Sequence, residues 1–343
     1  MKRMIAGILT FVLLLSGCTS SNMQQTGELF IMSTYVTQQV YGEHADEAIH
    51  AVNELLEAYD ATFSLYKEDS EINRINQNAG IAPTAVSEET FSLIQKAKQY
   101  SESSGGLFDL TVAPLSTLWG INSENPRVPS DEEIAAALNL VDYRDVILEE
   151  SEQTVYLKRE GMAIDLGGIA KGFFCEKIEE IYRQYDVSSA LVSIGGNIYT
   201  YGQKPDGESY RLGIRNPNDL NGSSIMGILS SHDEVVSTSG AYERYFEQDG
   251  MLYHHILDLE TGFPAQSDLL SVTVICKDGG LADFLSTTLY LEGRKAISSY
   301  LNSEQFQVIV IDQNNQVYIS PSLKERFTIT DSAFLLSEAV YSE

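Results

Sequence analysis

One carboxylate and two hydroxyls share a face of a predicted helix near the end of the chain. Asp283, Ser286 and Thr287 stand at positions i, i+3 and i+4 of an expected helix over residues 281–291, so their side chains lie close together. Such oxygen donors suit Mg²⁺, which completes its octahedron with water and substrate phosphates. An acidic residue near a helix start, with Ser and Thr bonded to preceding carbonyls, gives the same pattern. Both interpretations stay open.

A glycine-rich turn followed by a lysine forms a second candidate site. Residues 164–172 read Ile-Asp-Leu-Gly-Gly-Ile-Ala-Lys-Gly and join an expected strand over 162–164 to an expected helix over 170–185. Free N–H groups at a helix N-terminus attract anions, and Lys171 adds a positive charge there. The spacing differs from that of a P-loop. The pattern favours a phosphate or pyrophosphate site, with a tight turn and a solvated lysine as the alternative.

A third cluster spans residues 104–120, where two glycines precede Leu107, Phe108 and Asp109. Glycines let a backbone approach a flat ligand closely. Taken alone, however, the cluster is better explained by a core phenylalanine and a helix-capping aspartate. Residues 193–197 indicate only a strand that ends in a turn. Residues 237–244 are rich in Ser and Gly and fit either a loop that binds a polar ligand or a plain loop.

Two adjacent histidines precede an aspartate in the segment 253–262. In an expected strand over 252–257, alternation directs His254 and His255 to opposite faces. Isolated histidine pairs are usually structural. The neighbouring Asp258 and turn make a general base or a ligand contact a second possibility.

The charge of the chain excludes one large class of function. The sequence has 343 residues with 22 Lys+Arg and 49 Asp+Glu, a formal net charge of −27. Nucleic-acid binding relies on net or clustered basic residues, so no nucleic-acid partner is expected. The 43% hydrophobic content indicates a globular protein. An anionic substrate would need a local source of attraction.

The amino terminus has the pattern of an export signal. Lys2 and Arg3 precede an apolar run over residues 4–15, which ends in Leu-Ser-Gly-Cys at Cys18. This run is too short for a permanent membrane span. We expect a signal peptide over 1–17, lipidation of Cys18, a tether over 18–26 and a folded body over 27–343 outside the cytoplasm. An ordinary signal peptide with an incidental cysteine is the alternative.

The two remaining cysteines, Cys175 and Cys276, are expected to be buried free thiols rather than a disulfide. No cluster of Cys and His suggests zinc. Periodicity predicts a mixed α+β body, with mixed sheets flanked by helices. Expected helices cover residues 46–63, 87–101, 170–185, 281–291 and 294–301, with a short one opened by a capping box at 130–133. Expected strands cover 27–41, 146–148, 154–158, 162–164, 190–194, 210–214, 225–229, 235–238, 252–257, 270–276, 306–311 and 317–319.

Taken in order, the six clusters resemble the ApbE family of FAD:protein FMN transferases. The resemblance runs from about Phe30 to Gly293 and includes Met-Ser-Thr at 32–34, Phe-Ser-Leu-Tyr at 63–66 and the segment 70–76. It implies the flavin transferase fold of that family. The positions that match the family's FAD contacts are Met32, Tyr66, Leu107, Phe108, Asp109, Asp165, Lys171 and Ile256.

The resemblance also implies a magnesium site. Gly168 would contribute its backbone carbonyl, and Asp283 and Thr287 their side chains. Ser286 stands where some members have Asp, so its role as a ligand is in question. The family's frequent Asp-Pro after the histidine segment is Asp258-Leu259 here, a difference confined to a turn.

The implied reaction transfers FMN from FAD to a Thr or Ser hydroxyl of an exported acceptor flavoprotein, with Mg²⁺, and releases AMP. His255 is the candidate for proton transfer, with a carboxylate of the metal site, Asp283, as the alternative. Three other functions stay open: a magnesium-dependent FAD pyrophosphatase, a flavin-binding lipoprotein without catalysis, and a two-lobed solute-binding lipoprotein. The last explains export and length but not the flavin motifs.

Overall fold

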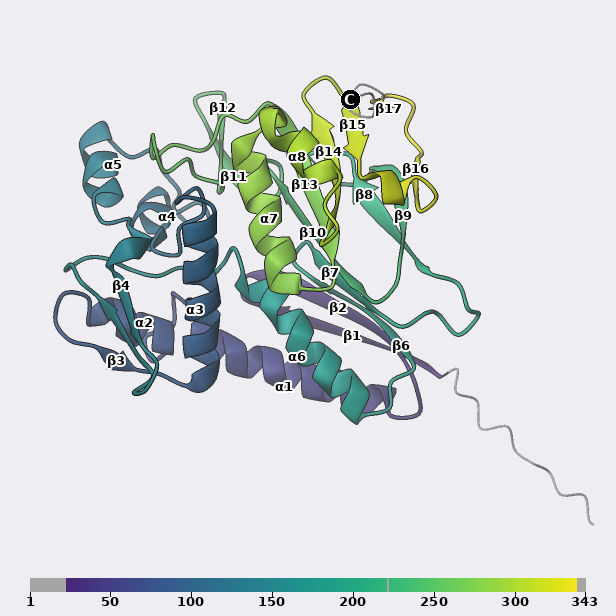
Figure 1. Ribbon diagram of the computed structural model, residues 1–343, viewed down its shortest axis with the longest axis horizontal. Coiled ribbons are helices and arrows are strands. Elements are labelled where there is room, and N and C mark those ends of the chain that lie inside the picture. Colours follow the sequence, from purple (N-terminus) through teal and green to yellow (C-terminus); the bar gives the residue numbers. More distant parts are fainter. Residues whose placement is uncertain (1–22, 221, 338–343) are drawn as a thin grey trace, which may run out of the picture.

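A nine-stranded sheet forms the centre of the molecule (Figure 1). The structure is a computed structural model that describes residues 23–220 and 222–337. The strand order is β1-β2-β6-β7-β10-β13-β14-β15-β17, with antiparallel neighbours except for the parallel pair β15 and β17. The strands are β1 (Gln24–Ile31), β2 (Thr34–Tyr41), β6 (Ser189–Ile194), β7 (Asn197–Tyr201), β10 (Glu234–Gly240), β13 (Leu269–Cys276), β14 (Gln307–Asp312), β15 (Gln316–Ile319) and β17 (Leu335–Leu336).

Three long helices pack on one face of this sheet: α1 (Ala45–Phe63), α6 (Ala170–Gln184) and α7 (Gly279–Glu292) (Figure 1). In α1 the buried residues Ile49, Val52 and Leu56 repeat at helical spacing, which gives the helix one apolar face. They belong to the main core together with Val192 of β6 and Val274 of β13.

The opposite face of the sheet is covered by a second sheet with the order β16-β9-β8. Its strands are β8 (Tyr210–Arg215), β9 (Ile225–Ser231) and β16 (Phe327–Ile329). Leu212 and Leu229 from this sheet share a second core with Val236, Ile275 and Ile309 of the main sheet. Strand β13 is therefore buried on both faces, which explains its nearly continuous apolar sequence.

A smaller lobe lies beside the main sheet, at the left of Figure 1. The rings of Tyr100 on α3 and Phe284 on α7 stack at 4.3 Å between centroids, with 6° between their planes. Lys96 of α3 also bonds Glu176 and Asp278, at 3.0 and 3.1 Å. These contacts hold the lobe against α6 and α7. Its elements are α2 (Glu71–Gln77), β3 (Thr84–Ala85), α3 (Glu88–Ser103), α4 (Ala113–Trp119), α5 (Asp131–Leu138), η1 (Tyr143–Asp145), β4 (Val146–Glu149) and β5 (Thr154–Leu157).

The predicted α+β class is confirmed, and the long helices begin and end within about two residues of their predicted bounds. The capping box is present at Ser130 and Glu133. Helices α2 and α4 were not predicted, and neither were the strands β3, β7, β16 and β17 or the first strand of a short hairpin. The remaining elements are that hairpin, β11 (Tyr245–Gln248) and β12 (Met251–His254), then η2 (Arg294–Ala296), α8 (Ile297–Leu301) and η3 (Pro321–Leu323).

Three predicted strands differ from the structure. The segment 27–41 is a hairpin, in which β1 begins at Gln24, inside the predicted tether. The strand predicted over 162–164 is reduced to one isolated bridge between Ala163 and Val112. The Asn76 side chain bonds both backbone groups of Ile164, at 2.7 and 3.2 Å, so the pairing does not extend. The strand predicted over 252–257 ends at His254, because the chain then turns back through a bond from Gly262 N to Asp258 O.

Cys175 and Cys276 are both free and buried, as predicted. None of the helices within residues 23–220 and 222–337 has the length and apolar character needed to cross a bilayer. The signal peptide predicted over 1–17 and the lipidation site predicted at Cys18 lie outside the described residues.

Candidate functional site

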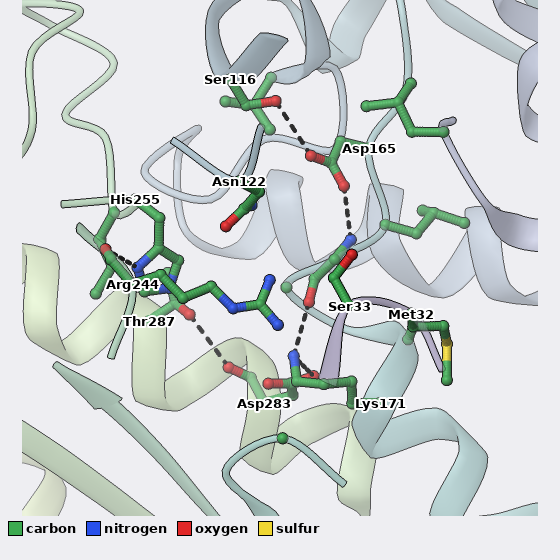
Figure 2. A pocket seen from close by; sticks show the side chains of 18 of the residues that line it. Met32, Ser33, Ser116, Asn122, Asp165, Lys171, Arg244, His255, Asp283 and Thr287 are labelled. Carbon is green, nitrogen blue, oxygen red and sulfur yellow. Dashed lines mark hydrogen bonds and ion pairs between the residues drawn. The ribbon is translucent and has the colours of Figure 1, made fainter. Parts of the chain in front are cut away.

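A cavity of about 500 Å³ lies between the small lobe, the tip of the β1–β2 hairpin and helices α6 and α7. Its walls come from segments far apart in the sequence (Figure 2). Every predicted flavin, metal or catalytic residue of the body except Ser286 lines it: Met32, Tyr66, Leu107, Phe108, Asp109, Asp165, Gly168, Lys171, His255, Ile256, Asp283 and Thr287.

The hairpin tip reaches the cavity through a tight turn. Met32 and Ser33 both have left-handed backbones, with φ of 50° and 55°, and both line the cavity. Gly195 lies against this turn, where a Cβ would come 2.4 Å from Thr34 Oγ1. Glycine suits this position because the Thr34 side chain fills the space of a Cβ and because φ is 50°, in the left-handed region.

The walls combine apolar surface with an open edge. Phe108 packs edge-to-face on Phe284 at 5.4 Å and is buried. Tyr66 also lines the cavity but stays 69% exposed, so it lies where the cavity meets solvent.

Asp109 is buried and accepts bonds from Thr111 and from Tyr143 N, at 2.7–2.9 Å. Burial raises the pKa of Asp109 above its ordinary value. Its carboxylate stabilises the surrounding loop.

The glycine-rich turn before α6 is held by its own side chains. Asp165 accepts bonds from Gly167 N at 2.8 Å and from Ser116 Oγ at 3.1 Å (Figure 2). Lys171 donates to the carbonyl oxygen of Gly167 at 2.9 Å. The first residue of α6 is Ala170, and no side chain caps this end. Of its first three N–H groups, that of Ala170 donates to Leu166 O at 2.9 Å and that of Gly172 donates to Asp283 Oδ2 at 3.3 Å. The attraction for an anion at this helix start therefore comes from Lys171 and from the positive end of the helix dipole.

Asp283 is brought to Lys171 by a close crossing of two helices. A Cβ on Gly172 of α6 would lie 1.9 Å from the carbonyl oxygen of Gly279 on α7, so the two backbones touch. At this crossing Gly172 N donates to Asp283 Oδ2 at 3.3 Å. Lys171 Nζ lies 3.5 Å from the same oxygen. Asp283 is 5% exposed, and its charge is balanced by Lys171.

Two serines of β10 form hydrogen bonds with the polar side chains of α7. Ser237 Oγ donates to Asp283 Oδ1 at 3.4 Å, and Ser239 Oγ lies 3.3 Å from Thr287 Oγ1. Ser286 is fully buried between them, 2.8 Å from Ser239 Oγ and 3.3 Å from Ser237 Oγ. Its hydroxyl supports the cavity wall without lining it. The segment 237–244, interpreted from sequence as a loop, begins as the strand β10.

The oxygen donors around Asp283 fit a magnesium ion. Asp283 and Thr287 line the same cavity as Gly168, whose carbonyl is the third predicted donor. Across the described residues, no cluster of three or more His, Cys, Asp or Glu could hold a metal. A metal here would have one carboxylate and neutral oxygens from the protein. Mg²⁺ accepts such a set, because it keeps several waters and takes substrate phosphates.

The two histidines have different roles. Both nitrogens of His254 are used, Nε2 by Ala265 O at 3.0 Å and Nδ1 by Ile256 N at 3.3 Å, so His254 is structural. His255 Nδ1 lies 3.3 Å from the carbonyl oxygen of Arg244 (Figure 2). A carbonyl only accepts, so Nδ1 carries the proton and Nε2 keeps its lone pair. Burial, followed by the nearby Arg244 charge, lowers the pKa of His255 to about 3.

Sequence reasoning gave no role to two polar residues of the cavity. Asn197 at the start of β7 and Arg244 after β10 both line it. Asn197 belongs to the segment 193–197, which indicated only a strand that ends in a turn. Arg244 is the last residue of the segment 237–244. Their importance depends on partners in space, which no sequence pattern reveals.

The family model described as "ApbE family" matches residues 32–310. The chain belongs to the ApbE family. A curated FAD:protein FMN transferase of Klebsiella pneumoniae is 34% identical over 317 residues, covering 92% of this chain and 98% of the relative. One of Treponema pallidum is 33% identical over 324 residues, with 89% of each chain covered.

The ApbE fold is also shared with solved structures. The ApbE protein of Thermotoga maritima superposes with a TM-score of 0.81 at 32% identity, over 89% of this chain and 99% of that one. The flavin transferase ApbE of Vibrio cholerae gives 0.78 at 28% identity, over 89% and 100%. The resemblance inferred from the six clusters is therefore confirmed at the level of family and fold.

Proposed function

We propose that this chain transfers FMN from FAD to a Thr or Ser hydroxyl of a partner protein, in a reaction that requires Mg²⁺ and releases AMP. The observation that carries the proposal is a single cavity in which Lys171, Asp283 and the free Nε2 of His255 converge. The curated relatives from Klebsiella pneumoniae and Treponema pallidum bear the name FAD:protein FMN transferase.

The chain offers separate groups to the parts of FAD. Met32, Tyr66 and Phe108 supply apolar and aromatic surface of the kind that a flavin ring contacts. Lys171 and the positive end of the α6 dipole attract the pyrophosphate. The net charge of −27 repels an anionic substrate. This local positive charge would attract the pyrophosphate in spite of that repulsion.

Asp283, Thr287 and the carbonyl of Gly168 would hold the metal. When bound, Mg²⁺ withdraws charge from the phosphoryl oxygens and so stabilises the transition state. Lys171 balances Asp283 and provides a further positive charge near the phosphates.

His255 is the proposed general base. Its Nε2 accepts the proton of the acceptor hydroxyl while that oxygen bonds to the phosphorus of the FMN half. The bond from this phosphorus to the AMP oxygen breaks, and AMP leaves with the electron pair. Asp283 is the alternative base, but Gly172 N, Ser237 and Lys171 already engage its oxygens, which favours His255.

We further propose that the body acts outside the cytoplasm, anchored by lipid on Cys18, and that its acceptor is an exported flavoprotein. The Leu-Ser-Gly-Cys pattern after the apolar run supports this location.

The decisive experiment incubates the purified protein with FAD, Mg²⁺ and an acceptor that carries a target Thr. A fluorescent acceptor band in a denaturing gel is the expected result, and replacing the target Thr by Val should remove the label. Free FMN and AMP without labelling would favour the FAD pyrophosphatase instead. Intact FAD that is merely retained would favour a carrier without catalysis.

A further inference from the structure

Arg244 is a cation of the cavity whose guanidinium is unpaired among the residues that the structure describes. The charged side chains that line the cavity are Asp60, Lys67, Asp109, Asp165, Lys171, Glu243, Arg244 and Asp283. Within residues 23–220 and 222–337, the guanidinium of Arg244 makes neither a hydrogen bond nor an ion pair, although its backbone carbonyl binds His255.

The other charges of the cavity are already engaged. Lys67 pairs with Asp60 at 2.6 Å, and Lys171 with Asp283 at 3.5 Å. Glu243, the neighbour of Arg244 in sequence, pairs instead with Arg215 at 3.2 Å. Asp109 accepts bonds from Thr111 and Tyr143. Asp165 accepts bonds from Gly167 and Ser116.

The position of Arg244 in the cavity favours the binding of an anionic ligand. The residue is half-buried, and a guanidinium carries five N–H donors that lose water on burial. Figure 2 shows its side chain extending from the backbone beside His255 into the cavity. An anion with several oxygens is the ligand that this planar group binds best.

A second donor without an acceptor lies beside Asp283. Asn197 is 2% exposed, and no atom in the described part of the chain accepts a hydrogen bond from its Nδ2. Its Oδ1 accepts a bond from Ser237 Oγ at 3.0 Å, and the same hydroxyl reaches Asp283. Two independent donors therefore line a cavity whose own acceptors are engaged, which indicates that the missing oxygens belong to the ligand.

We infer that Arg244 binds the pyrophosphate oxygens of FAD and neutralises charge on the phosphoryl group that is transferred. The inference rests on the proposed function, because FAD is the anion that the site takes. As the acceptor oxygen bonds to the FMN-side phosphorus and the bond to AMP breaks, negative charge spreads over the phosphoryl oxygens. Arg244 thereby acts together with Lys171, from a segment that also orients the proposed base, His255.

The test compares Arg244→Met with Arg244→Lys and with Arg211→Met. Arg211 is exposed on β8 and does not line the cavity, so this control makes the same change of charge elsewhere. FAD and flavin-free ADP are titrated against the purified protein, by flavin fluorescence and by the shift in melting temperature. Transfer is then measured at saturating FAD and acceptor.

We expect Arg244→Met to bind FAD and ADP about tenfold more weakly and to lower kcat by about 10²-fold. Its melting temperature without ligand should equal or exceed that of the wild type, because an unpaired charge is removed. Arg244→Lys should lie in between, since lysine keeps the charge but loses the planar fork. Arg211→Met should match the wild type.

Three outcomes would overturn the inference. Wild-type FAD affinity and kcat in Arg244→Met would exclude the phosphate contact. A raised KM for the acceptor alone would assign the guanidinium to the acceptor protein. A melting temperature lowered without ligand would make Arg244 a structural residue. Failure of the wild type to label any acceptor would count against the proposed function, while the FAD and ADP titrations would still report on Arg244.

Discussion

The Nδ1 atom of His255 lies 3.3 Å from the backbone carbonyl oxygen of Arg244. The backbone N–H of His255 donates to the same oxygen at 3.1 Å. One carbonyl thus fixes both the position and the tautomer of the imidazole, and it leaves Nε2 available as a base. Because a backbone atom performs this task, the orientation of His255 does not depend on the side chain at position 244.

The depressed pKa of His255 predicts a specific pH dependence of stability. Burial lowers it to about 3 in the folded protein, whereas an unfolded histidine titrates near 6.5. Between these values the unfolded chain binds the extra proton. The stability contributed by the neutral imidazole is therefore present above pH 6.5 and is lost as the pH falls toward 3. Urea unfolding of His255→Gln between pH 7 and 4 should show a shallower loss than the wild type, and parallel curves would contradict the assignment.

Asp283→Asn should abolish the Mg²⁺-dependent transfer of FMN. The amide keeps the shape of the side chain and an acceptor for Gly172 N, but it removes the charge that a metal and Lys171 require. We expect at least a 10³-fold loss of labelling in the in-gel assay, in the range seen when metal or transition-state charge stabilisation is removed. Asp206→Asn, at an exposed carboxylate that does not line the cavity, is the control. Normal labelling by Asp283→Asn at ordinary Mg²⁺ concentration would refute the metal assignment.

Substitutions of Ser286 and Thr287 should have different effects on transfer and on stability. Thr287 lines the cavity, whereas the Ser286 hydroxyl is buried against Ser239. Thr287→Val should lower transfer strongly and weaken the apparent affinity for Mg²⁺. Ser286→Ala should keep transfer within a few-fold and cost about 1 kcal/mol of unfolding free energy for a lost buried hydrogen bond. The reverse pattern would make Ser286 the ligand.

Gly172→Ala should be harmful although helix propensity favours alanine. In an ordinary helix interior this change gains about 0.5–1 kcal/mol. Here the added Cβ would lie 1.9 Å from the Gly279 carbonyl, and it would push α6 away from α7. We expect a net loss of about 1–3 kcal/mol in chemical unfolding and a loss of transfer, because Lys171 and Asp283 separate. A stabilised, active variant would disprove the tight crossing.

The export prediction is tested by Cys18→Ala. Without the thiol no lipid can be attached, so the body should leave the membrane fraction and appear in the soluble fraction outside the cytoplasm. Fractionation and detergent partitioning would measure this. A variant that stays with the membrane would contradict lipid anchoring.

The long helices could be predicted because their information is local. The apolar spacing in α1 and the caps of α3 and α5 are contained within one or two turns. Residues 162–164 were predicted wrongly as a strand for the opposite reason. Their backbone bonds go to the side chain of Asn76, which lies 88 residues from Ile164 in the sequence.

Most of the residues that line the cavity could also be predicted from the sequence. Which of their side chains bond to one another could not. Glycine pairs and Asp283 stood out by residue type and spacing. The role of Arg244 depends on Glu243, its neighbour in sequence, forming its ion pair with Arg215. The supporting role of Ser286 depends on its hydrogen bonds with two serines of β10. Such preferences arise only when distant strands meet.

The strand order of the main sheet has a consequence for how the protein matures. Early and late strands are interleaved, with β2 beside β6 and β7 beside β10, and the crossing of α6 with α7 joins Gly172 to Gly279. A nascent chain that has reached only its middle therefore lacks both the second helix and the β10 serines. Contacts of such long sequence separation form late and slowly. The cavity that binds the dinucleotide should therefore be completed in one of the last steps of folding. A partly synthesised chain should not bind the dinucleotide.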